Sequence, residues 1–339
     1  MSKHAYPEFH KALLEQATYP AAPRRIKFEE TRRSYLYRTG EHLYKLRKAS
    51  PLYSSPAIRE RYAQVALSLG QRWARDVVQA VVPILRTPGG YALTGEGEAV
   101  DYALRMVQLP DSHWLHRMLE HGKVTPTHVG RLARFLAEQH AAAALGEKAA
   151  EMGHPHRLQA LFDELIYQSK KHFGQTLSEP VLDMIVRPLS KYLDEVHKLL
   201  VRRLKRGRIV EGHGAPVPEH FCLQGDDVHA LAPLDAQPKF RQLDAANDVA
   251  VLINALESRG QGEHAELLVK RYVAAAKDRD LPRVLPLYCV LQALRDGLQR
   301  SEWVAELPPD SAERPELARQ ATAAYNQALR VARALPKLI

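Results

Sequence analysis

The chain of 339 residues is 45% hydrophobic and 26% charged, a composition typical of globular proteins and unlike that of disordered ones. Its net charge of +9 favours anionic ligands, whether nucleotides, nucleic acid or acidic proteins, without choosing among them. The only two cysteines, Cys222 and Cys289, exclude a disulfide framework, and no apolar run is long enough to cross a bilayer. We therefore expect a cytoplasmic protein with no membrane partner.

The first hundred residues predict a small sheet with one helix. Residues 26–48 alternate polar with apolar or aromatic side chains around a turn at Thr39, Gly40 and Glu41, a pattern typical of a hairpin. A helical segment at about 57–75 follows. Strand-like segments are then expected at 82–86, 91–95 and 99–109.

Helices dominate the sequence from residue 110 onward. Thr125 followed by Pro126 indicates a helix start, and Pro180 opens a long amphipathic helix. Residues 209–235 break into a loop and two short strand-like runs, and further helices are expected at 244–258, 262–276, 283–299 and 315–335. The sequence thus predicts an α+β protein with a β-rich N-lobe (1–108) and a large helical C-lobe (109–339). The C-lobe would contain a loop at 211–222 and a hairpin at 220–235.

Four segments fall in the order and spacing of one known family. They are ETRRSYLYRTGEHLYKLRKAS (30–50), the stretch from VDYALRMVQL to RFLAEQHA (100–141), GRIVEGHGAPVPEHFCL (207–223) and KFRQLDAANDVAVLINAL (239–256). The chain resembles bacterial aminoglycoside phosphotransferase-like proteins, in particular the kinase-like half of the bifunctional aminoglycoside phosphotransferase/ATP-binding proteins. This resemblance implies a two-lobed protein-kinase-like fold, with ATP and Mg²⁺ as cofactors.

The resemblance places the catalytic loop at HGAPVPEHF (213–221), where the family has His-Gly-Asp. Ala215 stands at the position of the general base, whose assistance is typically worth about 10²- to 10⁴-fold in rate. Ala232 stands at the position of the principal metal ligand, so that Asp235 is a weak candidate for a Mg²⁺ ligand. His213 and His220 remain at the family's two histidine positions, where a structural role is favoured for both.

The resemblance also places nucleotide-binding residues on the first strands. Lys45 stands at the position that neutralises the ATP phosphates, although its spacing is equally typical of a solvated strand lysine. The family's glutamate partner for this lysine is replaced by Gln64, Val65 and Ala66, so that Lys45 is expected to lack a positioning partner. The candidate nucleotide-binding residues are Lys45, Ser34, Arg32, Arg33 and Met106.

Other charged residues are assigned structural roles. Asp244 and Asp248 match a helix start in the family and are expected to cap that helix and brace the catalytic loop. The basic residues that close the long helix are Arg202, Arg203, Lys205, Arg206 and Arg208. Cations are favoured near a helix C-terminus, which explains this cluster more simply than contact with nucleic acid does.

These features favour a pseudokinase that binds a nucleotide, another anion or a protein partner without transferring phosphate. Two alternatives stay open. The first is a slow or atypical ATP-dependent small-molecule phosphotransferase that uses Lys45, Asp235 and His220. The second is a nucleic-acid-binding protein on a kinase-like scaffold, for which the net charge is the evidence.

Overall fold

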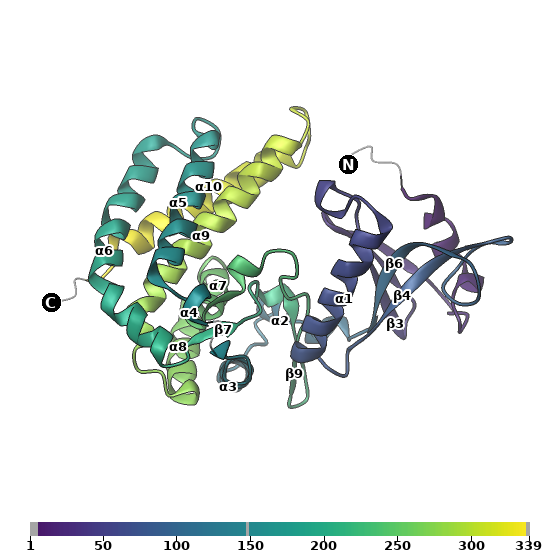
Figure 1. The fold of residues 1–339 in the computed structure, drawn as a ribbon, viewed down its shortest axis with the longest axis horizontal. Helices are drawn as coiled ribbons and strands as arrows, with labels where there is room; N and C mark the ends of the chain where they lie inside the picture. Colours follow the sequence, from purple (N-terminus) through teal and green to yellow (C-terminus); the bar gives the residue numbers. More distant parts are fainter. Residues whose placement is uncertain (1–5, 147–148, 337–339) are drawn as a thin grey trace. The chain divides into compact units, whose positions relative to one another are not determined.

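The computed structural model describes residues 6–146 and 149–336. The chain divides into two compact units. The β-rich unit contains Lys3–Gly122 together with Glu219–Ala236, and the helical unit contains Lys123–Pro218 together with Gln237–Ile339. The long strands lie in the first unit and the long helices, apart from α1, in the second (Figure 1), which confirms the predicted α+β class.

The β-rich unit is built on a six-stranded antiparallel sheet with the order β1-β2-β3-β6-β4-β5. Its strands are β1 (Lys27–Glu30), β2 (Ser34–Arg38), β3 (His42–Arg47), β4 (Val78–Thr87), β5 (Gly90–Ala92) and β6 (Glu98–Val107). The first predicted strand is divided in two, because the Thr31 hydroxyl accepts the Ser34 N–H at 2.9 Å and closes an additional turn. The other predicted strands and the helix α1 (Pro56–Trp73) are confirmed.

The two faces of this sheet bury different partners. Tyr35, Tyr37, Tyr44 and Leu46 pack in one cluster with Phe9 and Leu13 of the N-terminal 3₁₀ turns. The opposite face forms a second cluster, in which Leu43, Val78 and Met106 contact Cys222 and Leu231. Because side chains alternate along a strand, Lys45 and Arg47 lie on the same face of β3 as Leu43.

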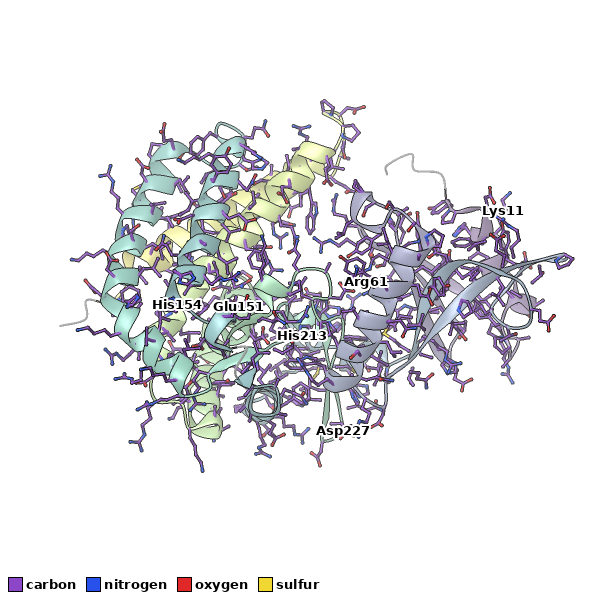
Figure 2. All side chains as sticks on the ribbon, in the orientation of Figure 1. Lys11, Arg61, Glu151, His154, His213 and Asp227 are labelled. Carbon is purple, nitrogen blue, oxygen red and sulfur yellow. The ribbon has the colours of Figure 1, made fainter. Side chains whose placement is uncertain are left out.

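The segment near residue 221 forms the predicted hairpin. β8 (Phe221–Gln224) pairs antiparallel with β9 (Asp227–Ala230), and Gly225 with Asp226 makes the turn, as expected for this sequence. Asp227 marks the tip of the hairpin in Figure 2. β8 also forms a bridge from Cys222 to Trp114 just before α2 (Leu115–Glu120), which places the hairpin in the β-rich unit.

The helical unit contains most of the helices (Figure 1). Those described are α3 (Pro126–Ala142), α4 (Ala149–Met152), α5 (Pro155–Ser169), α6 (Glu179–Lys205), α7 (Ala246–Glu257), α8 (Gly262–Ala276), α9 (Leu281–Glu306) and α10 (Arg314–Arg333). The start of α3 is confirmed, since the Thr125 hydroxyl accepts the His128 N–H. α10 packs on α9 and α6. In the described ranges no helix has both the length and the apolarity needed to cross a membrane.

A buried arginine joins several of these helices. Arg203 of α6 is 1% exposed and donates hydrogen bonds of 2.7–2.8 Å to the carboxylates of Asp244 and Asp278. Asp244 ends β10 (Gln242–Asp244), which pairs with β7 (Ile209–Glu211). The prediction of a simple helix-end role for the whole basic cluster is therefore wrong for Arg203, whose charge links α6 to β10 and to the end of α8.

Candidate functional site

A cationic group lies on the hairpin-facing side of β3. The Arg47 guanidinium forms an ion pair with the Asp235 carboxylate, in which the side chains are 20% and 7% exposed, respectively. The guanidinium carbon also lies 4.6 Å from the centre of the Tyr53 ring. This ion pair joins β3 to the segment that follows the hairpin.

Lys45 lies on the same face of β3, two residues before Arg47. The pKa of its ammonium group is lowered to about 8, mainly by burial and to a lesser extent by the positive charges of Arg47 and Arg33, while Asp235 opposes the shift. Throughout the described part of the chain, no carboxylate hydrogen-bonds or pairs directly with this ammonium group. Lys45 is thus a partly buried cation whose strongest neighbouring charge, that of Arg47, is also positive.

Mg²⁺, which the kinase resemblance implies, does not fit these residues. Asp235 is already engaged by Arg47, and Ala232 offers no side-chain oxygen. Across residues 6–146 and 149–336, no group of three histidines, cysteines or carboxylates is arranged to hold a metal ion. Since Mg²⁺ is bound through carboxylate oxygens and phosphates, these side chains do not offer the free carboxylate that a metal ion would need.

The backbone at Ala232 is left-handed, with φ 58°. This conformation is uncommon for residues other than glycine, and aspartate and asparagine adopt it more readily than alanine. The chain at the predicted metal-ligand position therefore has a conformation that suits aspartate better than the alanine it carries.

The predicted catalytic loop, in the helical unit, is held by a buried carboxylate from α7. Asp248 Oδ2 accepts the His213 N–H at 2.5 Å, and Asp248 Oδ1 accepts the Gly214 N–H at 2.8 Å. Gly212 is needed for this approach, because a Cβ there would lie 2.6 Å from Asp248 Oδ2. Figure 2 marks His213 in this loop. The predicted bracing role of Asp248 is confirmed, and Asp244 accepts the Ala246 N–H at the start of α7 as expected.

The same carboxylate is fixed from its other side by two residues that the sequence did not indicate. His140 Nε2 lies 3.2 Å from Asp248 Oδ2, and His140 Nδ1 lies 2.7 Å from the Tyr272 hydroxyl. Burial alone would raise the pKa of Asp248, but its hydrogen bond with His140 and the charges of His140 and His213 lower the pKa below its usual value. Asp248 is therefore an ionised structural anchor.

Ala215 follows this braced segment. The adjacent carbonyl of Gly214 accepts a hydrogen bond of 3.0 Å from Arg295, whose guanidinium carbon lies 4.4 Å from the Phe240 ring centre. Both oxygens of Asp248, which hydrogen-bond the two residues before Ala215, are occupied by hydrogen-bond donors. The loop is consequently held by several hydrogen bonds, and both oxygens of its neighbouring carboxylate are engaged.

The other predicted site residues lie in the β-rich unit. Ser34 is 3% exposed, and Met106 is 5% exposed within the hairpin-facing apolar cluster. Arg32 and Arg33 are exposed in the turn between β1 and β2, where the Arg33 carbonyl accepts the Lys48 N–H at 2.9 Å. His220 ends a 3₁₀ turn, and its carbonyl accepts the Leu231 N–H at 2.8 Å. Their predicted contacts with nucleotide stay predictions.

Arg47 was not predicted as a site residue. The signal was present in the sequence, because Lys45 and Arg47 are two residues apart in a strand and must share a face. The ion pair with Asp235 could not be inferred, since it joins residues 188 positions apart.

No family model matches the chain. Among curated proteins, uncharacterized proteins of Mycobacterium tuberculosis and Mycobacterium bovis are 20% identical to it over 273 residues. The match covers 79% of this chain and 53% of each relative, so the chain spans about half the length of the curated relatives it matches.

Solved structures identify the fold. A choline/ethanolamine kinase family protein from Mesorhizobium loti is 14% identical with a TM-score of 0.55, covering 97% of this chain and 100% of that one. An aminoglycoside phosphotransferase from Alicyclobacillus acidocaldarius is 14% identical with a TM-score of 0.51, and the match covers 98% of this chain and 97% of that one. A microcompartment-associated aminopropanol kinase is 14% identical with a TM-score of 0.52, and the match covers 95% of this chain and 96% of that one. The chain therefore has the two-lobed kinase-like fold of these phosphotransferases, and the predicted resemblance is confirmed at the level of the fold.

Proposed function

We propose that this kinase-like chain is a pseudokinase that binds the phosphate groups of a nucleotide or a related anion without a metal ion and without transferring phosphate. The observation that carries the proposal is the Arg47–Asp235 ion pair beside Lys45. A guanidinium occupies the carboxylate that would otherwise hold Mg²⁺. The site thus supplies its own fixed positive charge.

The charges of this group favour phosphate over other ligands. Arg47 and Arg33 both act on Lys45 as like charges, and Asp235 is the acid that opposes them. Guanidinium groups match phosphate oxygens in geometry, and a partly buried ammonium gains most when an anion replaces its lost hydration. A phosphate would therefore relieve the unfavourable environment of Lys45 directly.

The residues of the predicted catalytic loop support the proposal that the chain does not transfer phosphate. Phosphoryl transfer in this fold class needs a base that orients the attacking hydroxyl. Ala215 has no such group, and Asp248 is committed to the backbone of the loop and to His140. The retained loop is compatible with a regulatory protein whose output is binding, including binding to a protein partner.

Thermal melting with ATP, ADP and inorganic pyrophosphate, each with Mg²⁺ and with a chelator, tests this proposal. A ligand at a hundred times its dissociation constant stabilises a protein by about 2.7 kcal/mol, which is readily measured. We expect the same stabilisation with and without metal, and its loss in Arg47→Met. Arg61→Met, which removes an exposed cation from α1 in the same unit (Figure 2), is the matched control.

Two results would overturn the proposal. Stabilisation that requires Mg²⁺, together with ATP turnover that disappears in Asp235→Ala, would identify a slow phosphotransferase. Equal stabilisation of wild type, Arg47→Met and Arg61→Met would show that the β3 cations are not the binding site.

A further inference from the structure

A basic cavity lies in the helical unit, where α6 and α8 end. Its volume is about 280 Å³, and its cationic lining residues are Arg203, Arg206, Arg208, Lys277 and Arg279. Two acids, Asp278 and Asp280, also line it, so that positive side chains exceed negative ones by three. None of these residues belongs to the catalytic loop or to the β3 group.

The acids of the cavity are already occupied. Asp278 accepts two hydrogen bonds from Arg203, at 2.7 and 2.8 Å. The Asp280 carboxylate forms ion pairs with two guanidinium groups: its Oδ1 lies 3.2 Å from Arg202 Nη2, and its Oδ2 lies 2.9 Å from Arg206 Nη1. Arg208 also lies near Asp278, with its Nε 3.8 Å from Oδ2. Because these pairs neutralise both acids, the charges of Lys277 and Arg279 are left to attract a ligand.

Two cations at the rim have no such partner. Lys277 and Arg279 are exposed, and within the described residues neither side chain makes a hydrogen bond or an ion pair. Arg208 lies beside them and donates hydrogen bonds of 3.2 Å to the carbonyls of Ala276 and Lys277. It thereby counters the negative end of α8, which would otherwise repel an anion.

Lys277 is also held in an unfavourable backbone conformation. Its φ is 50°, and the Asp278 N–H donates to the Val273 carbonyl at 3.1 Å, the hydrogen bond of a helix ending in which glycine is usual. A lysine at this position costs stability that a glycine would avoid. The strain and the two unpaired cations are independent features of one short segment.

We propose that this cavity binds a compact phosphorylated compound. Arginine and lysine form short, charge-assisted hydrogen bonds to phosphate oxygens. Ligand pockets typically measure about 300–1,000 Å³, so this one suits a small anion that carries one or two phosphates. Nucleic acid is less suitable, because backbone recognition uses an extended basic surface instead of one small cavity.

Calorimetric titration with inorganic pyrophosphate tests the proposal. The full chain carrying Lys45→Met serves as the starting protein, because the β3 anion site is then removed and the two proposals are tested separately. We expect one binding site, and an affinity about a hundredfold weaker after Lys277→Gln with Arg279→Gln, since each of the two charge-assisted contacts is worth about a factor of ten. The control pair Lys270→Gln with Arg271→Gln removes the same charge from exposed positions of α8.

Lys277→Gly separates binding from folding. It is expected to raise the melting temperature while it weakens pyrophosphate binding, which a purely structural role of Lys277 does not produce. Equal weakening by the cavity pair and the control pair would overturn the proposal in favour of diffuse electrostatic attraction. Binding of a short DNA duplex that depends on Lys277 and Arg279, without pyrophosphate binding, would overturn it in favour of nucleic acid.

Discussion

Lys45→Met is expected to stabilise the protein and to abolish anion binding by the β3 group. The pKa of Lys45 falls from 10.5 to about 8 in the folded chain, mainly because of burial. Each pKa unit corresponds to about 1.4 kcal/mol, so the charged side chain costs up to roughly 3 kcal/mol at pH 7, less where water reaches it. Methionine has a similar length and fits beside Leu36 and Leu104, the residues paired with Lys45 in the sheet. We expect a gain of about 1–3 kcal/mol.

The gain in stability from Lys45→Met is expected to depend on pH. Between pH 8 and about 10.4 the unfolded chain still holds the Lys45 proton while the folded chain has released it, so the stability of the wild type rises with pH in this range. Urea unfolding of wild type and Lys45→Met from pH 6 to pH 10.5 should therefore show the largest difference below pH 8, shrinking above it. A variant less stable than wild type at pH 7, or a difference independent of pH, would refute the reasoning. Arg61→Met should change stability little at any pH.

Three further predictions concern the framework. Asp248→Ala leaves the buried N–H groups of His213 and Gly214 without an acceptor and should lower the free energy of unfolding, measured in urea, by about 2–6 kcal/mol. The control Asp183→Ala removes an exposed carboxylate and should stay within about 0.5 kcal/mol of wild type. Arg203→Met removes the hydrogen-bonded cation from two buried carboxylates, of which Asp278 keeps only Arg208 at 3.8 Å, and should cost about 3–5 kcal/mol. The same change at Arg206, whose side chain is 60% exposed, should cost less than about 1 kcal/mol. Ala232→Gly should stabilise by about 0.5–1 kcal/mol because glycine accepts φ 58°; destabilisation on chemical unfolding would contradict this.

Much of the fold could be predicted because it follows from local patterns. Alternation in the first strands, the Thr125-Pro126 helix start and the period of α6 and α8 each depend on residues close in sequence. The misses have a different origin. No helix was predicted at α5, which begins with Pro155, and β7 pairs with β10 through a ladder of three residues that is too short to leave a sequence pattern.

The candidate site was less predictable because charges interact through space. Periodicity could place Lys45 on a strand, but not the Arg47–Asp235 ion pair, nor the position of His140 between Tyr272 and Asp248. Arg203 was assigned to a helix end from its neighbours in sequence, whereas its partners are 41 and 75 residues away. Buried polar networks of this kind connect distant segments and become visible only after the chain has folded.

The buried carboxylates that the chain contains stabilise the fold, whereas the acids that are missing at positions 215 and 232 would not be needed for stability. Asp244, Asp248 and Asp278 are buried and satisfy buried donors, so stability alone is sufficient to maintain them. An acid at position 215 or 232 would be present for chemistry, and Ala232 lies in a backbone conformation that alanine disfavours. Stability does not explain Lys45, however, because its charge opposes folding. The proposed binding of an anion by the β3 group would account for a residue that weakens the fold and lies near the like charge of Arg47.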